Sequence, residues 1–334
     1  MFGWKKTPPL GKENIPPGEK SATDEIVKLS LADMNIGRRP VLRGQHPKSH
    51  GCIRARFEVC ADIRDEFRHG LFKTVGSYDA LVRFSNFSRA DDSQSDTRGM
   101  AVKLFHNGDA IQDFVMIDHP VFFIRNAADY VIFVRAFVRS RGSRIVRRLR
   151  FFPEWVKNLV RFMIVFNGFY WRRPRELWII WKMSRKPPRN VLDIQYWSST
   201  PYKLGPRAIR FSARPVSLKG DPCHGLRDSM RQDLQYCGVT FDFLVQLQTD
   251  AKAMPVEDPT VNWDELKSPY RRVATIEIDP QDLGPDSGPC PCENLSFSPW
   301  NSLPEHEPLG GINRVRKEVY KAVSDRRIRM NQEP

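Results

Sequence analysis

Polar residues interrupt the apolar runs between residues 83 and 125. Three segments carry them: Arg83-Phe-Ser-Asn86, Asp96-Thr-Arg-Gly-Met-Ala-Val-Lys-Leu-Phe105 and Asp118-His-Pro-Val-Phe-Phe-Ile-Arg125. Each segment is typical of a strand or a strand end, and the polar residues are Arg83, Ser85, Arg98 and Asp118. A buried polar side chain costs free energy unless it has a partner. These interruptions therefore indicate a polar cofactor or a substrate channel.

Two further pairs of residues could do chemistry. Arg43 and His46 are three residues apart, and Arg316 and Tyr320 are four apart. The second pair lies in a helix predicted over 313–325, where residues four apart share a face. A phenol titrates at about 10, but an adjacent guanidinium favours the anion, so Tyr320 could serve as an anionic oxygen group. A histidine titrates at about 6.5, which suits general acid-base catalysis.

The order of these motifs resembles the haem-dependent catalase family. The resemblance is closer to the small catalase-related proteins, which have the catalase core without the C-terminal domain. Arg43-Gly-Gln-His46 resembles the family's Arg-x-x-His, and Arg316-Lys-Glu-Val-Tyr320 resembles its Arg-x-x-x-Tyr. The segments between 83 and 125 resemble the barrel core, so the matching motifs extend over most of the chain.

The resemblance implies a haem b cofactor whose iron is bound by Tyr320. It also implies that His46 is the distal acid-base catalyst, that Ser85 orients the imidazole ring, and that Asp118 occupies a third catalytic position. The other haem-binding positions are Arg43, Arg83, Phe123 and Arg316. His50 is a second candidate for the distal role, but it lacks the Arg-x-x-His context.

Two residues depart from the family pattern. Asp118 stands where the family has asparagine, and a carboxyl group lacks the amide's donor unless it is protonated, which burial would favour. Gln45 precedes the distal histidine, where typical catalases have an aliphatic residue that keeps the pocket dry. Both changes argue against simple disproportionation of hydrogen peroxide.

The expected fold is α+β, a catalase-like antiparallel eight-stranded β-barrel with surrounding helices and a haem-binding C-terminal helix. The predicted strands are 53–59, 79–85, 100–105 and 112–117, followed by 208–212, 239–247 and 273–278. A helical insertion over 139–189 separates the two groups, and a polar helix is expected at 226–236. We expect a flexible N-terminal arm over 1–25 and a single haem domain over 26–334.

Nearly all of the excess charge lies in residues 139–189. The net charge of the chain is +14, and this segment has fifteen Lys or Arg residues against Glu154 and Glu176. Ten aromatic residues share the segment, in apolar runs too short to cross a bilayer. Two interpretations stay open: helices that lie on an anionic membrane surface, or amphipathic helices that pack on the barrel with solvated arginines. A nucleic-acid partner is not expected, because no recognition motif accompanies the charge.

The cysteines and the N-terminus favour an intracellular protein. Six cysteines in 334 residues are too few and too irregular for a disulfide framework. The N-terminus lacks an apolar core of signal-peptide length. We therefore expect reduced thiols, and peripheral membrane association if the helices of 139–189 bind lipid.

Three functional hypotheses follow. The first is a haem enzyme that acts on organic hydroperoxides, in particular those of fatty acids, by peroxidase or hydroperoxide-rearranging chemistry. The second is a hydrogen peroxide catalase. The third is a catalase-like protein that binds haem or lipid at a membrane without turnover. The sequence leaves open the identity of the substrate, the product, the electron donor and the oligomeric state.

Overall fold

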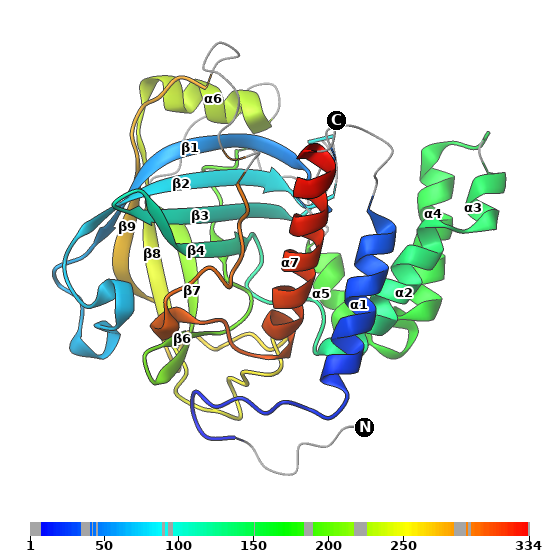
Figure 1. Cartoon of the computed structure of the whole chain (residues 1–334), viewed down its shortest axis with the longest axis horizontal. Coiled ribbons are helices and arrows are strands. Elements are labelled where there is room, and N and C mark those ends of the chain that lie inside the picture. The colour runs from blue at the N-terminus through cyan, green and yellow to red at the C-terminus, as the bar shows by residue number, and fades with distance from the viewer. Residues whose placement is uncertain are drawn as a thin grey trace.

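The structure is a computed structural model of the 334-residue chain. It describes residues 8–34, 41, 43–44, 46–88, 91–92, 96–149, 151–183, 190–216, 226–283, 292 and 295–332. Figure 1 shows a β-barrel with a layer of helices standing beside it.

Eight strands close into an antiparallel barrel. Their order is β5-β4-β3-β2-β1-β9-β8-β7, and β5 closes the ring because it pairs with both β4 and β7. The strands are β1 Lys48–Val59, β2 Ser77–Asn86, β3 Arg98–His106, β4 Asp109–Ile117, β5 Tyr196–Trp197, β7 Arg207–Pro215, β8 Val239–Leu247 and β9 Arg271–Ile278. A short strand, β6 (Tyr202–Leu204), pairs with the first part of β7. The predicted eight-stranded antiparallel barrel in an α+β chain is confirmed.

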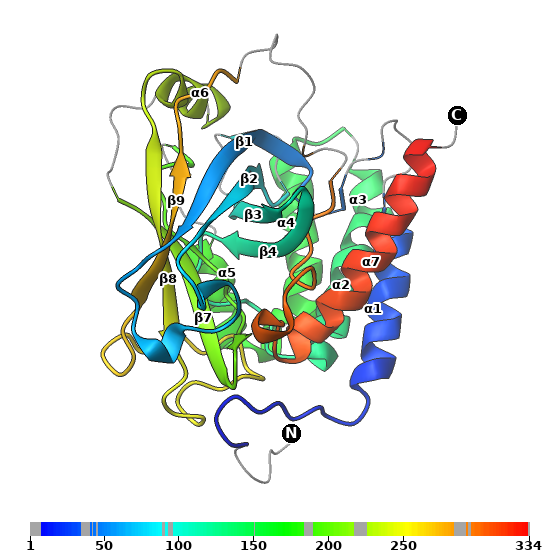
Figure 2. The ribbon, with the colours of Figure 1, turned by 60° about the vertical axis from the view of Figure 1, so that its left-hand side comes forward.

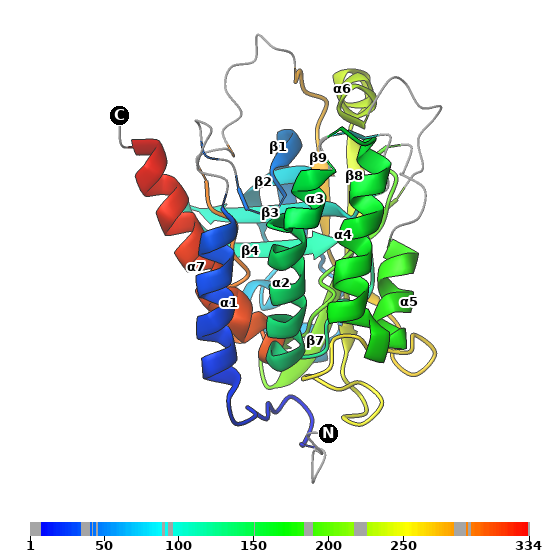
Figure 3. The same cartoon turned by 90° about the vertical axis from the view of Figure 1, so that its right-hand side faces the viewer.

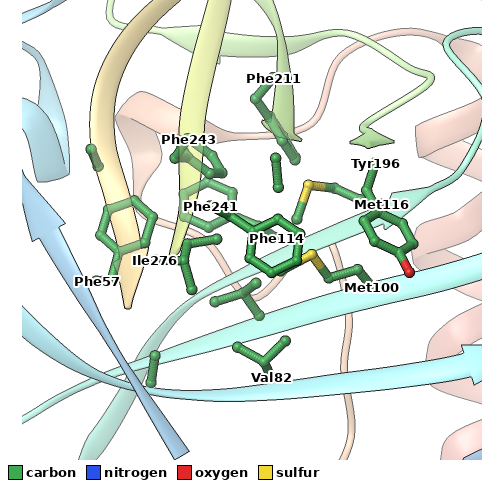
Figure 4. Close-up of a cluster of buried hydrophobic side chains, with 14 of the residues drawn as sticks. Phe57, Val82, Met100, Phe114, Met116, Tyr196, Phe211, Phe241, Phe243 and Ile276 are labelled. Carbon is green, nitrogen blue, oxygen red and sulfur yellow. The ribbon is translucent and has the colours of Figure 1, made fainter. Parts of the chain in front are cut away.

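Aromatic side chains fill the interior of the barrel. In β8, Phe241 and Phe243 alternate with partly exposed residues and are fully buried. Figure 4 shows Phe243 near Phe57, Phe114 and Phe211. The ring centroids of Phe114 and Phe243 are 4.6 Å apart, and those of Phe57 and Phe114 are 5.7 Å apart. Because apolar burial is the main favourable term in folding, this core fixes the strands whose ends carry the polar residues.

A layer of helices covers one side of the barrel. Figure 3 shows α7, α1, α2, α4 and α5 following one another across this side. Figure 2 shows α7 alongside α1. The helices are α1 Glu19–Asp33, α2 Ala127–Arg141, α3 Arg144–Arg148, α4 Glu154–Gly168, α5 Pro174–Met183, α6 Leu226–Tyr236 and α7 Gly311–Gln332. A second apolar cluster joins this layer, and it includes Ile26, Val131, Val165, Ile179 and Val315.

Several boundaries differ from the expected ones. Helix α1 begins at Glu19, inside the segment 1–25 that we expected to be an arm, and α7 is longer than the predicted 313–325. The segment 139–189 holds the end of α2 together with α3, α4 and α5. In the part of the chain that the structure describes, none of the helices combines the length and the apolar character that a membrane span needs.

A disulfide joins Cys52 in β1 to Cys292, 240 positions later in the chain. This corrects the expectation of reduced thiols, which holds for the free cysteines Cys60 and Cys237. The spacing of cysteines along the sequence could not reveal the pair, because only the closed barrel brings the two Cα atoms to 5.7 Å.

Candidate functional site

His46 lies just before β1 and is held on several sides. Its N–H donates to the carbonyl of Phe87 at 3.0 Å, and its own carbonyl accepts from Nη2 of Arg83 at 2.9 Å. Nδ1 shares a hydrogen bond with Oγ of Ser85 at 3.0 Å, and the ring of Phe87 packs edge-on at 5.3 Å between centroids. The φ angle of His46 is 53°, in the left-handed region that a non-glycine residue keeps only where its surroundings fix it. The imidazole is therefore preorganised.

Gly99 in β3 leaves the space that the imidazole of His46 occupies. It stands opposite Ser85 in the pairing of β2 with β3. A Cβ atom on Gly99 would lie 2.5 Å from Cε1 and 2.6 Å from Nδ1 of His46. The sequence analysis assigned no role to this residue. A glycine inside a strand indicates a close approach, so the signal was present in Arg98-Gly-Met100.

His46 is neutral at physiological pH. Burial, followed by the positive charges of three arginines, lowers its pKa to about 3. The arginines are Arg83, Arg316 and Arg43. By surface area the side chain is only half-buried, but three nearby guanidinium groups still oppose a positive charge on the ring. When Nδ1 donates its proton to Ser85, Nε2 carries a lone pair that can accept a proton.

Asp118 follows β4 and lies beside the same strand ends. Its N–H donates to the carbonyl of Arg98 at 3.0 Å. Burial raises the pKa of Asp118 to about 7, against the lowering effects of the backbone hydrogen bond and the charge at Arg98. Near neutral pH a fraction of this carboxyl group is protonated, and that form can donate a hydrogen bond as an asparagine amide does.

Arg316 and Tyr320 form a pair on α7. Nη2 of Arg316 donates to the hydroxyl of Tyr320 at 3.2 Å, and Nη1 donates to Asn313 at 3.1 Å and Thr200 at 3.4 Å. These acceptors are neutral, and no carboxylate among the described residues forms an ion pair with Arg316. Burial opposes the charge, but the interactions with Tyr320 and Tyr202 outweigh it and raise the pKa of Arg316. A permanent cation therefore adjoins the phenol.

The segment before β1 lies against α7. A Cβ atom on Gly44 would be 3.5 Å from Cγ1 of Val323. Val323 follows Tyr320 by three residues, so both lie on the same face of the helix. The charge of Arg316 also contributes to the pKa of His46. Figure 1 shows α7 beside the ends of β1 to β4. The structure thus brings the two terminal motifs to the same side of the barrel.

The other residues predicted to bind haem include Arg43 and Phe123. Nη2 of Arg43 donates to the carbonyls of Cys292 and Leu295, each at 2.6 Å. Phe123 is buried in the helix cluster, with its ring 5.1 Å from that of Phe133. Gln45 lies outside the described residues. The roles assigned to these residues stay predictions.

His50 belongs to a different group of side chains. It is 1% exposed, and its Nε2 hydrogen-bonds Oδ1 of Asn86 at 2.6 Å. The same oxygen accepts from Arg98 at 2.5 Å, while Nδ2 of Asn86 donates to Asp92 at 2.7 Å. This buried network gives His50 a structural role and favours His46 as the distal candidate.

Residues 23–163 match the family model described as Catalase. Peroxisomal catalase A from Saccharomyces cerevisiae is 25% identical over 312 residues, which cover 83% of this chain and 56% of that protein. The catalase from Cavia porcellus is 31% identical over 134 residues, which cover 39% of this chain and 25% of that protein. Part of this chain is therefore similar in sequence to catalases.

Solved catalase structures share the fold of this chain. A bacterial catalase matches with a TM-score of 0.64 at 14% identity, over 99% of this chain and 65% of that one. Catalase A from Saccharomyces cerevisiae matches with a TM-score of 0.58 at 18% identity, over 99% of this chain and 70% of that one. Identity at this level shows the fold alone. The chain spans about half the length of the curated yeast protein that it matches, with 56% covered.

The match to catalases supports haem as the cofactor, and the residues present fit that group. Haem iron in catalase is held by a tyrosine, and Tyr320 offers a phenol beside the cation of Arg316. Haem also carries two carboxylates, for which guanidinium groups are the best partners, and Arg43 and Arg83 are near enough to act on the pKa of His46. The donor set is thus appropriate for haem.

Proposed function

We propose that the chain is a haem-dependent enzyme that metabolises organic hydroperoxides. The observation that carries the proposal is the convergence of a neutral histidine and an Arg–Tyr pair, with Arg316 close enough to act on the pKa of His46. In this proposal Tyr320 holds the iron, and Arg43 and Arg83 hold the propionates. Phe123 packs against the cofactor. Bound haem supplies the redox chemistry that cleaves an O–O bond.

The protein's own contribution is the handling of a proton. Nε2 of His46 accepts the proton of the hydroperoxide and returns it to the departing oxygen, which is general acid-base work. The hydrogen bond to Oγ of Ser85 orients the ring, and in the tautomer whose Nδ1 donates to Ser85, Nε2 is unprotonated. Asp118, when protonated, donates a hydrogen bond to a peroxide oxygen, and this requires the raised pKa of about 7.

The preference for organic hydroperoxides over hydrogen peroxide rests on the two departures from the family pattern, Gln45 and Asp118. An apolar surface that could attract lipids adds support. The test is to supply purified holoprotein with a fatty-acid hydroperoxide and, separately, with hydrogen peroxide. Consumption of the lipid hydroperoxide is the expected result. Rapid oxygen release from hydrogen peroxide, with the lipid untouched, would favour a true catalase. No turnover of either would favour the non-catalytic binding protein.

We further propose that α4 and α5 contact an anionic membrane surface. Helix α4 exposes Trp155, Leu159, Phe162 and Met163, whose spacing places them on one face. Their exposed fractions are 68%, 52%, 47% and 46%. More large apolar side chains lie exposed around them, namely Phe151, Phe152, Trp171, Trp178 and Trp181. Figure 3 shows α4 and α5 next to each other at the end of the helix layer farthest from α7.

The charges around this apolar face favour an anionic lipid over a neutral one. Exposed arginines flank it at Arg144, Arg148 and Arg172, and no ion pair within the described chain engages them. Glu176 is buried, and Glu154 is neutralised by contacts with basic neighbours. Tryptophan at the headgroup level with arginine near phosphate is the usual composition of an interfacial helix.

Vesicle flotation tests this contact. Full-length protein should float with vesicles of phosphatidylcholine and phosphatidylserine, and less with phosphatidylcholine alone. The triple variant Trp155→Ser, Phe162→Ser, Trp171→Ser should stay in the dense fraction, whereas Leu266→Ser, which changes a 95% exposed side chain elsewhere, should float like wild type. Equal flotation of the triple variant would contradict a lipid contact. Self-association that only the triple variant abolishes, without lipid binding, would mean that a second copy covers this face.

A further inference from the structure

The Cys52–Cys292 disulfide involves residues that adjoin two arginines of the candidate site, Arg43 and Arg83. Cys52 is half-buried in β1, and Cys292 is fully buried in the stretch of chain that precedes α7. The bond joins residues 240 positions apart. It therefore ties the strand that follows His46 to the part of the chain that leads to Tyr320.

The disulfide reaches Arg43 through a carbonyl group. Nη2 of Arg43 donates to the carbonyl of Cys292 at 2.6 Å and to that of Leu295 at 2.6 Å. The first acceptor belongs to the cysteine that the disulfide anchors. A guanidinium group has five N–H donors, so an arginine fixed through one nitrogen can still present others to a carboxylate. The disulfide thus sets where the guanidinium of Arg43 is held.

The other end of the disulfide adjoins the second arginine of the site. Cys52 stands opposite Arg83 in the antiparallel pairing of β1 with β2. Nη2 of Arg83 donates to the carbonyl of His46 at 2.9 Å. Each cysteine is therefore linked to an arginine of the site, Cys292 through a hydrogen bond from Arg43 and Cys52 through its pairing with Arg83.

We propose that the Cys52–Cys292 disulfide is a redox-sensitive positioning element for Arg43, and that its reduction weakens the site's hold on haem. The inference rests on the proposed haem site. In the chemical step, a dithiol reductant breaks the S–S bond through a mixed disulfide. The two electrons and two protons of the dithiol pass to Cys52 and Cys292, which become thiols, and the reductant becomes a disulfide.

The first measurement needs no haem. Thiol counting on the denatured apoprotein, with peptide mapping by mass, should find Cys52 and Cys292 joined before reduction and free after it. Two unlinked thiols in protein purified without reductant would overturn the proposal at once. The mapping also separates this bond from any bond to Cys290, which lies outside the described residues.

The second measurement is a haem titration followed by absorbance. Cys52→Ser should bind haem about tenfold more weakly than wild type, because hydrogen bonds to a charged group are lost or misplaced. Cys237→Ser, which removes an exposed free thiol, should match wild type. Reduction of the disulfide should weaken haem binding by wild type by a similar factor. It should leave haem binding by Cys52→Ser unchanged.

Arg43 distinguishes positioning from general loss of stability. Arg43→Ala should weaken haem binding, and the double variant Cys52→Ser, Arg43→Ala should be no weaker than Arg43→Ala alone. Additive losses would mean that the disulfide acts through overall stability, which would overturn the positioning role. If no variant binds haem although the disulfide is present, the proposed function fails instead. Equal haem binding by oxidised and reduced wild type would reject the inference and leave the haem site intact.

Discussion

At the ends of β1 to β4, the backbone N–H and the carbonyl of His46 both form hydrogen bonds, and its ring is hydrogen-bonded to Ser85. On α4, Trp155 is 68% exposed. The first region holds its polar atoms through hydrogen bonds of 2.9 to 3.0 Å, whereas the second leaves large apolar groups in water. Preorganised groups serve chemistry, and exposed apolar surface serves binding. Substitutions should therefore alter activity in the first region and association in the second.

Removing the imidazole should have the largest effect. His46→Ala should lower peroxide turnover by about a hundredfold to ten-thousandfold, the usual contribution of a general acid-base group. His50→Asn is the matched comparison, because His50 lies four residues away within a buried network. Turnover is measured with saturating haem. Equal losses in both variants would show that the two regions around β1 are not functionally distinct.

A single methyl group at Gly99 should have the next largest effect. Gly99→Ala places a Cβ atom 2.5 Å from the imidazole of His46, so the ring must move. Misplacement by about 1 Å can cost about a hundredfold in rate. Gly76→Ala meets no atom within 4 Å and should leave the rate unchanged. The two rates, compared at equal haem content, show whether the close packing of His46 matters.

Activity should fall as pH rises through about 7 if protonated Asp118 donates a hydrogen bond. Asp118→Asn keeps a donor at every pH, so its profile should lack this step.

The stability of the folded protein should also fall as the pH rises. The pKa of Asp118 is higher in the folded protein than in the unfolded chain, so the native state binds this proton more tightly. The free energy of unfolding should therefore decrease as the pH rises from about 4 to about 7. Urea melts of both proteins at pH 5 and pH 8 measure this, and a parallel shift in the two would exclude Asp118 as the cause.

The smallest effect on stability should come from the exposed face of α4. Trp155→Ala should change the free energy of unfolding by no more than about 0.5 kcal/mol, since surface changes are usually within that range. Phe169, at 1% exposure, lies on the inner side of the same layer. Phe169→Ala should cost about 3 to 5 kcal/mol. Comparable losses of unfolding free energy for Trp155→Ala and Phe169→Ala in denaturant melts would mean that Trp155 is packed against the protein and is not available for binding.

The regular parts of the fold could be predicted from local pattern. The alternation over 239–243 in β8 and 274–278 in β9 is a strong signal, because one face of each strand is buried there. The sequence pattern did not indicate β5, the strand that closes the barrel. β5 has only two residues, Tyr196 and Trp197, so no periodicity can mark it. Its pairing depends on where β4 and β7 already lie.

The candidate site could be predicted only where its residues form short motifs. Arg43 with His46 and Arg316 with Tyr320 are readable because local spacing defines each pair. Gly99 and the Cys52–Cys292 bond matter through contacts between distant segments, which spacing along one chain does not reveal. The raised pKa of Asp118 also follows from burial in the assembled barrel.

The proposal that Tyr320 would hold the haem iron is tested most directly by absorbance spectroscopy. Wild type and Tyr320→Phe should be expressed with haem supplementation and purified side by side. Wild type should give a ferric high-spin spectrum of the tyrosinate type, and the variant should lose or change it. Identical spectra in both proteins, or no bound haem in either, would contradict the assignment.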